Sequence, residues 1–426
     1  MRAYRYLAVS TLSLLLCVPL AFSQSVRDAQ SVQANPAGTQ VEIPLATASR
    51  LERAKNSWWP TKKARSREDF VGNKICAGCH SEKTSSQAAT PMANAARPVS
   101  DARILRAHPA MSATRGKFTY AISQTSAGFT YSVSDGANHL SAVILWAFGV
   151  ANKGQTYIYE KDGEYYESEM SYYAAISGLD VTTGHEQKRP ETLEDALGIL
   201  QDPPAAQKCF ACHTTGATTV SGGFAPQYAT PGVTCEACHG PGGSHAVLMQ
   251  QLQGEAAAAP PAHGTLQILN PRSLSPIASV DFCGACHRTW ADVYEMQVGV
   301  TGPVNSRFQP YRLENSKCWG ESGDARLTCV ACHDPHQPLQ RDAAAYDAKC
   351  LACHSAANAK SMAATKRPVA ASLAAGAGDP RIAKPCPVAK AKCVTCHMPK
   401  INVPVMHSDF TDHRIRIVRK GEPYPE

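Results

Sequence analysis

The pattern C-x-x-C-H occurs seven times in this chain of 426 residues. Two cysteines three residues apart can bind the two vinyl groups of one porphyrin as thioethers, and the next residue places an imidazole beneath the iron. The pattern therefore predicts seven covalently attached c-type haems. In chain order, the first to seventh motifs are Cys76–His80, Cys209–His213, Cys235–His239, Cys283–His287, Cys329–His333, Cys350–His354 and Cys393–His397.

Each motif assigns three side chains to its haem. The predicted thioether cysteines are Cys76, Cys79, Cys209, Cys212, Cys235, Cys238, Cys283, Cys286, Cys329, Cys332, Cys350, Cys353, Cys393 and Cys396. The predicted proximal iron ligands are His80, His213, His239, His287, His333, His354 and His397. Redox dithiols and zinc ribbons also use C-x-x-C, but neither requires a histidine directly after the second cysteine. All seven copies have that histidine, which favours haem.

The N-terminus has the pattern of a secretory signal. Arg2 and Arg5 precede an apolar run over residues 7–22, and small residues follow at a cleavage site near Ser23. We therefore expect export to the periplasm or beyond, where c-type haem is attached. Cys17 leaves a lipoprotein as an alternative, although the large Leu16 directly before it argues against one. No later segment has the roughly 20 apolar residues of a transmembrane helix.

The formal charge of +7 is a poor guide to partners. Removing the signal's two arginines leaves +5, and each ferric haem with two ionised propionates contributes about −1, for a total near −2. We therefore expect no nucleic-acid partner. The expected partners are redox proteins, with the donor and the acceptor unspecified.

The haem density constrains the fold. Residues 24–426 divided among seven motifs leave about 58 residues per haem, too few for separate domains. The predicted fold class is a multihaem cytochrome c, mostly irregular, with short α-helices around stacked haems and an inserted antiparallel β region. Alternating residues between Lys117 and Tyr173, separated by turn signals, indicate four or five strands in that insertion.

These patterns predict six segments. They are a signal peptide (1–23), an extended N-terminal arm (24–72), a first haem segment (73–114), a β-rich insertion (115–180), a haem core carrying six haems (181–413) and a C-terminal tail (414–426). Two low-complexity linkers fall within the haem core, at residues 255–263 and 357–384.

The second axial ligand of each iron decides its chemistry. A second histidine or a methionine suits electron transfer, whereas an open position permits substrate chemistry. Eight histidines lie outside the motifs, and His263, in the Ala/Pro linker, is the weakest candidate. The candidate distal ligands are His108, His139, His185, His245, His336, His407 and His413, with Met92 as an alternate. Seven histidines for seven haems are consistent with bis-histidine ligation throughout, although the agreement is one of number and not of geometry.

Tight turns beside the attachment motifs single out two of these histidines. His245 follows the third motif through Gly-Pro-Gly-Gly-Ser, and His336 follows the fifth through Asp-Pro. Such turns direct a side chain toward a neighbouring haem. Cys318 and Cys386 remain outside the haem count, either as a disulfide or as two separate thiols.

The motifs and their surroundings resemble the multihaem cytochromes of the cytochrome c554 type. The resemblance rests on the first motif followed by Thr90-Pro91-Met92, on residues 233–245, on residues 326–336, and on residues 393–400 with 411–415, and it covers most of residues 73–419. It implies haems stacked in close pairs, mostly bis-histidine ligation and electron transfer. It also implies His245, His336 and His413 as distal ligands, and His108 less firmly. Relatives often carry histidine where this chain has Met92.

Two functions follow from these patterns. The first is an exported electron carrier with no catalytic residues, to which every residue named above can contribute. The second is a multihaem oxidoreductase that reduces or oxidises a small nitrogen or sulfur anion at one open-site haem. The chain lacks a C-x-x-C-K variant, and its supply of histidines makes an open site unnecessary, so the sequence favours the carrier. Assembly into an extracellular filament through the N-terminal arm is a further alternative.

Overall fold

The computed structural model describes residues 67–150, 152–218, 223–254, 268–295, 302–316, 318–319, 327–354 and 386–425. All of them belong to one structural unit, Ser49–Glu426. The predicted signal peptide, most of the N-terminal arm, His263 and both linkers lie outside the described residues. No helix in the described ranges is both long enough and apolar enough to cross a membrane.

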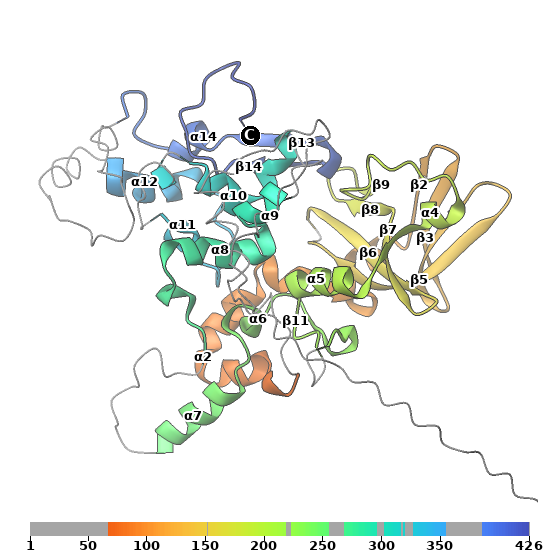
Figure 1. Cartoon of the computed structure of the whole chain (residues 1–426), viewed down its shortest axis with the longest axis horizontal. Coiled ribbons are helices and arrows are strands. Elements are labelled where there is room, and N and C mark those ends of the chain that lie inside the picture. Colours follow the sequence, from red (N-terminus) through yellow and green to blue (C-terminus); the bar gives the residue numbers. More distant parts are fainter. Residues whose placement is uncertain are drawn as a thin grey trace, which may run out of the picture. The chain divides into compact units, whose positions relative to one another are not determined.

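A ten-stranded antiparallel sheet is the largest element (Figure 1). Its main path runs β10-β7-β6-β5-β4-β3-β2, with β1 paired to β5, and β8 paired to both β6 and β9. The strands are β1 (Ala96–Pro98), β2 (Ala110–Arg115), β3 (Phe118–Thr125), β4 (Gly128–Ser134), β5 (His139–Phe148), β6 (Gly154–Lys161), β7 (Glu164–Ser168), β8 (Met170–Tyr173), β9 (Gly178–Val181) and β10 (Gly198–Gln201).

The predicted fold class is wrong. The chain is not mostly irregular polypeptide around haems, because this sheet extends from Ala96 to Gln201 and has ten strands, not four or five. Successive hairpins pair β2 with β3, β3 with β4 and β4 with β5 in continuous register. The register shifts between Ile144 and Trp146 in β5, and the rest of that strand pairs with β1 and β6.

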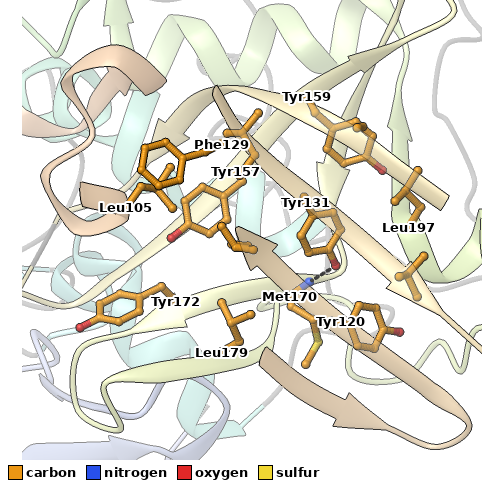
Figure 2. Close-up of a cluster of buried hydrophobic side chains, with 14 of the residues drawn as sticks. Leu105, Tyr120, Phe129, Tyr131, Tyr157, Tyr159, Met170, Tyr172, Leu179 and Leu197 are labelled. Carbon is orange, nitrogen blue, oxygen red and sulfur yellow. Dashed lines mark hydrogen bonds between the residues drawn. The ribbon is translucent and has the colours of Figure 1, made fainter. Parts of the chain in front are cut away.

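The sheet has an aromatic core of its own (Figure 2). Alternate residues of β3 and β4 point inward, so that Tyr120 and Tyr131 are fully buried and stack with ring centroids 6.4 Å apart. Tyr159 of β6 extends the stack, 6.0 Å from Tyr131. Thr192 caps helix α4 (Leu193–Leu197), because its side chain accepts a hydrogen bond from the Asp195 backbone, and the helix adds the buried Leu197 to the core. The sheet can therefore bury apolar surface without a cofactor.

Short helices dominate the rest of the described chain. They are α2 (Asn73–Ala88), α3 (Arg103–Ala107), α5 (Pro203–His213), α6 (Cys235–His239), α7 (Gly243–Gly254), α8 (Pro276–His287), α9 (Trp290–Glu295), α10 (Gln309–Glu314), α11 (Cys329–Cys332), α12 (Asp347–His354) and α14 (Cys393–His397). Local sequence explains two of the starts. Asp202 and Ser275 cap α5 and α8 with their side chains, and each helix has proline in its first turn.

A buried ion pair ties the C-terminal segment to α10. Arg312 and Asp412 are fully buried, and the guanidinium donates to both carboxylate oxygens, at 2.8 and 3.0 Å. Burial alone would raise the pKa of Asp412, but the hydrogen bonds and charge of Arg312 outweigh it and lower the pKa. Asp412 directly follows β14 (Ser408–Thr411), which pairs with β13 (Lys400–Val403), and the ion pair therefore positions the segment that carries His413.

Two buried tyrosines of the sheet, one with a hydrogen-bond partner for its hydroxyl and one without, allow a matched test of the polar contacts in the core. The Met170 backbone donates a hydrogen bond to the Tyr131 hydroxyl at 3.2 Å (Figure 2), whereas the Tyr157 hydroxyl is buried without a partner among the described residues. Tyr131→Phe leaves a buried N–H unpaired, and we expect it to lower the free energy of unfolding by about 1–3 kcal/mol. Tyr157→Phe should be neutral or stabilising. Denaturant unfolding followed by circular dichroism compares them, and equal losses would contradict this description of the core.

Candidate haem-binding site

Each of the seven motifs lies on a helical turn. His213, His239, His287, His354 and His397 are the last residues of α5, α6, α8, α12 and α14. His333 directly follows α11, and His80 lies at a kink within α2, with φ −118° and ψ 44°. Residues i, i+3 and i+4 share one face of a helix. In α5, α6, α8 and α14, where the whole motif is helical, the two cysteines and the histidine therefore face the same side, as attachment to one porphyrin requires.

One continuous cavity of about 5050 Å³ is lined by residues of all seven motifs. The volume far exceeds the roughly 300–1,000 Å³ of an ordinary small-molecule pocket. Divided by seven, it gives about 720 Å³ per motif, which is within the range for one cofactor each. The cavity and the donor set therefore fit a group of haems that share protein walls.

Backbone carbonyls orient several of the motif histidines. The Nδ1 atoms of His213, His239 and His397 lie 3.0, 2.8 and 2.9 Å from the carbonyl oxygens of Ala95, Leu269 and Arg416. An Nδ1–H donated to a carbonyl leaves Nε2 free to bind iron. Burial lowers the pKa of His213 and of His239, which favours the neutral imidazole that a metal requires.

Cysteines of different motifs lie against one another in three places. Hydrogen bonds between side chains join Cys76 to Cys235, Cys283 to Cys329, and Cys350 to Cys393. The contact with Cys76 lowers the pKa of Cys235 to about 7. The first motif is therefore beside the third, the fourth beside the fifth, and the sixth beside the seventh.

Further contacts join these pairs into a series. Cys238 of the third motif lies within electrostatic range of Cys283 in the fourth, and Cys332 of the fifth lies within range of Cys350 in the sixth. The second motif meets the fourth, where Cys212 Sγ is 3.6 Å from the Ala285 carbonyl oxygen. Helix packing agrees, because α2 contacts α6, α5 and α11 contact α8, and α12 contacts α14. The motifs follow the spatial order first, third, fourth, fifth, sixth and seventh, with the second beside the fourth.

Two histidines outside the motifs lie opposite motif histidines at the spacing of an iron site. The ring centroids of His336 and His239 are 6.0 Å apart with nearly parallel planes, and those of His413 and His333 are 6.2 Å apart. Two imidazoles on opposite sides of one metal, with bonds of about 2.0–2.1 Å, have centroids roughly 6 Å apart. The Nδ1 of His413 lies 2.9 Å from the Thr411 carbonyl oxygen, and burial lowers the pKa of His413 to about 4. Both pairs are thus suited to hold an iron.

Two other candidate ligands also line the cavity. His245 lies in α7, within electrostatic range of His239, and Met92 begins the short helix η2 (Met92–Asn94). Three of the seven predicted distal histidines therefore line the cavity, namely His245, His336 and His413.

The other four predicted distal histidines do not line this cavity. His108 contacts the Tyr172 hydroxyl at 3.4 Å, and His139 is exposed at the start of β5. His407 lies 2.7 Å from an Asp180 carboxylate oxygen. In the described part of the chain, three of the seven predicted distal histidines line this cavity, and a ligand role for the other four stays a prediction.

His185 is held by two carboxylates. Its Nδ1 and Nε2 atoms lie 2.8 Å from Glu169 and 3.4 Å from Glu167, so both ring nitrogens are engaged. Burial alone would lower its pKa, but hydrogen bonds and charges from Glu167 and Glu169 outweigh it and raise the pKa to about 9. A protonated imidazole has no lone pair for iron, and the site therefore disfavours His185 as a ligand.

Several cavity residues were not identified from the sequence. Phe148 stacks on the His213 ring at 5.1 Å, and the Gln309 side chain lies against His287. Arg288 and Arg307 also line the cavity. Only Arg288 had a sequence signal, since it directly follows the fourth motif. Cys318 and Cys386 form no disulfide with each other.

One comparison with known proteins agrees with the motif chemistry. The family described as "Cytochrome c554 and c-prime" matches residues 163–240, which include the second and third motifs. The solved structure titled "Crystal Structure of Outer Cell Wall Cytochrome OcwA" is 18% identical, with a TM-score of 0.46, and the match covers 82% of this chain and 80% of that one. None of the curated proteins matches the chain.

The family match supports the resemblance that the motifs carry, to the multihaem c-type cytochromes. Proteins of this class hold haem c covalently and transfer electrons. The motif helices, the shared cavity and the carbonyl-oriented histidines are what such cofactors require.

The His185 site predicts a pH dependence of stability. The folded-state pKa of about 9 lies above the usual value of 6.5, so protonated His185 stabilises the fold fully below about pH 6.5. This contribution is lost as the pH rises through 9. His185→Gln should remove that part of the slope in the free energy of unfolding, while His139→Gln, on an exposed strand end, should retain it. An unchanged slope in His185→Gln would refute the assignment.

Proposed function

We propose that the protein is an exported seven-haem c-type cytochrome that transfers electrons along closely spaced haems. The observation that carries the proposal is the series of neighbouring motifs around one cavity. Porphyrins attached to cysteines that touch one another must themselves lie close together, at separations that favour electron tunnelling. The protein then sets each potential through ligand identity, burial and nearby charge.

The spatial order of the motifs gives the proposed path. Electrons would pass through the haems of the first, third, fourth, fifth, sixth and seventh motifs, with the second haem as a branch at the fourth. The two ends of this series lie on α2 and α14. Redox partner proteins would exchange electrons near these ends, and the periplasm or the cell exterior is the proposed location.

The paired rings support two ligand assignments. We assign His336 as distal ligand to the haem of the third motif and His413 to that of the fifth, because their rings lie 6.0 and 6.2 Å from the motif histidines. His336 follows the fifth motif but faces the third. A ligand from one motif's loop would thereby bind the neighbouring motif's iron and fix the distance between two haems.

One observation favours a second candidate function. Four of the predicted distal histidines are engaged elsewhere or exposed, and these include His185 and His407, each of which faces a carboxylate. Fewer histidines in the cavity leave room for an iron with an exchangeable position. The second candidate is therefore a multihaem oxidoreductase acting on a small nitrogen or sulfur anion.

Rapid mixing of the oxidised holoprotein with a one-electron donor tests the electron-transfer proposal. We expect an initial phase whose rate rises with donor concentration, followed by redistribution among haems at rates independent of it. Concentration-independent phases report transfer within one molecule. If every phase scaled with donor concentration, the haems would be reduced independently and the proposed path would be wrong.

Substitution of the assigned distal ligands tests the iron sites. His336→Ala and His413→Ala should each convert one haem equivalent from low spin to high spin without loss of covalent haem, because the thioethers are untouched. His139→Ala, at an exposed position outside the cavity lining, is the matched control and should leave every spin state unchanged. Electron paramagnetic resonance of the oxidised proteins measures the change. Unaltered spin states in both cavity variants would refute the assignments.

A further inference from the structure

The second and fourth motifs meet in surroundings unlike those of the third and fifth. The aromatic ring stacked on His213 is Phe148, and the side chain against His287 is Gln309. By contrast, histidine rings lie opposite His239 and His333. The junction of the second and fourth motifs therefore has different chemistry from the rest of the series.

Two arginines line the cavity at this junction. Arg288 directly follows the fourth motif, has a positive φ of 66°, and lies within electrostatic range of Cys209 in the second motif. Arg307 ends η7 (Gly302–Arg307) and lies within electrostatic range of Arg288. Both line the cavity, so two positive charges approach each other in a partly desolvated space.

The Arg307 guanidinium makes only weak contacts with the described part of the protein. It lies over the Phe308 ring at 4.7 Å, and one amine nitrogen, Nη1, donates to Met406 Sδ at 3.7 Å. Its Nε atom is buried and has no hydrogen-bond partner in the described part of the chain. Burial, and then the charge of Arg288, lower its pKa. A partly buried cation without a matching anion is costly, so a compensating negative charge would stabilise this position.

The acidic groups nearby are held by other partners. Glu186 lies within electrostatic range of Arg307, but its carboxylate accepts hydrogen bonds from the Gly184 backbone at 2.9 and 3.0 Å. Asp292 also lines the cavity, where it accepts from the backbone and hydroxyl of Thr289. Glu167 interacts with His185. Within the described part of the chain, none of these carboxylates is hydrogen-bonded to Arg288 or Arg307, which leaves both guanidinium groups available to an oxyanion.

We propose that Arg288 and Arg307 form an oxyanion-binding pair at the junction of the second and fourth motifs. The guanidinium fork matches the planar geometry of a carboxylate or a small inorganic oxyanion. Two sources share this chemistry, namely the propionate of a bound haem and a dissolved anion such as nitrite. This inference depends on one part of the proposed function, namely that haems occupy the cavity.

The test uses holoprotein in four forms: wild type, Arg307→Met, Arg307→Lys and Arg103→Met. Arg103 is exposed on α3 and absent from the cavity lining, which makes it the matched control. Sodium nitrite is titrated into each protein while the haem absorption band is recorded, and the midpoint potentials of the haems are measured without nitrite. Covalent haem content is checked first in every variant.

Two results would support the pair and identify its source. If wild type and Arg103→Met respond to nitrite and Arg307→Met binds it at least tenfold more weakly, the ligand is a dissolved oxyanion. If nitrite has no effect but one midpoint potential falls in Arg307→Met, the ligand is a propionate, because a nearby cation stabilises the reduced haem. Arg307→Lys keeps the charge and should preserve most of that potential.

The proposal is overturned if Arg307→Met changes neither nitrite binding nor any midpoint potential relative to Arg103→Met. Should Arg307→Met fail to mature, Arg307→Lys provides the second test through nitrite affinity, since lysine lacks the planar fork. Where wild type binds nitrite, an unchanged nitrite affinity in Arg307→Lys also overturns the pair. Electron redistribution among the remaining haems does not depend on Arg307, so failure here is distinguishable from failure of the electron-transfer proposal.

Discussion

The geometry of C-x-x-C-H on a helical turn governs the haem-bearing part of this structure. Because the two cysteines and the histidine share one helix face, each motif helix must direct that face toward its cofactor. Six of the seven motifs lie at or beside a helix end, and only α2 continues past its kinked His80. The apolar clusters near these helices are small, such as Val280 with Leu313 and Trp319. Haem therefore supplies the core that this part of the chain lacks, whereas the sheet is filled by its own tyrosines.

Polar contacts then set the chemistry of each position. Backbone carbonyls orient His213, His239 and His397, and the Arg312–Asp412 ion pair positions the segment that carries His413. The carboxylates of Glu167 and Glu169 contact both ring nitrogens of His185. The environment differs along the series of motifs. Histidine rings face the third and fifth motifs, whereas arginines line the junction of the second and fourth. A path with unlike sites can combine electron transfer with binding of an anion, and the two proposals are compatible for that reason.

The sequence predicted local chemistry better than spatial assembly. The motifs, the helix starts at Asp202 and Ser275, and the alternation in β3 and β4 are local patterns and could be found directly. The strands β1 and β10 could not, because Ala96–Pro98 and Gly198–Gln201 carry no alternation and become strands only by pairing with β5 and β7. A count of histidines could not separate His413 from His185. One lies opposite a motif histidine and the other between two glutamates, and that difference arises from tertiary packing alone.

In the proposed function the haems form one closely spaced series. Low-temperature electron paramagnetic resonance of the oxidised holoprotein, integrated and compared with the chemically determined haem content, tests it most directly. Magnetic coupling between neighbouring ferric haems should broaden or remove part of the signal, so the integrated intensity of isolated low-spin haems should fall well below the haem total. If every haem instead gave an independent signal and the intensities accounted for the full haem content, the haems would be magnetically isolated and the account would be contradicted.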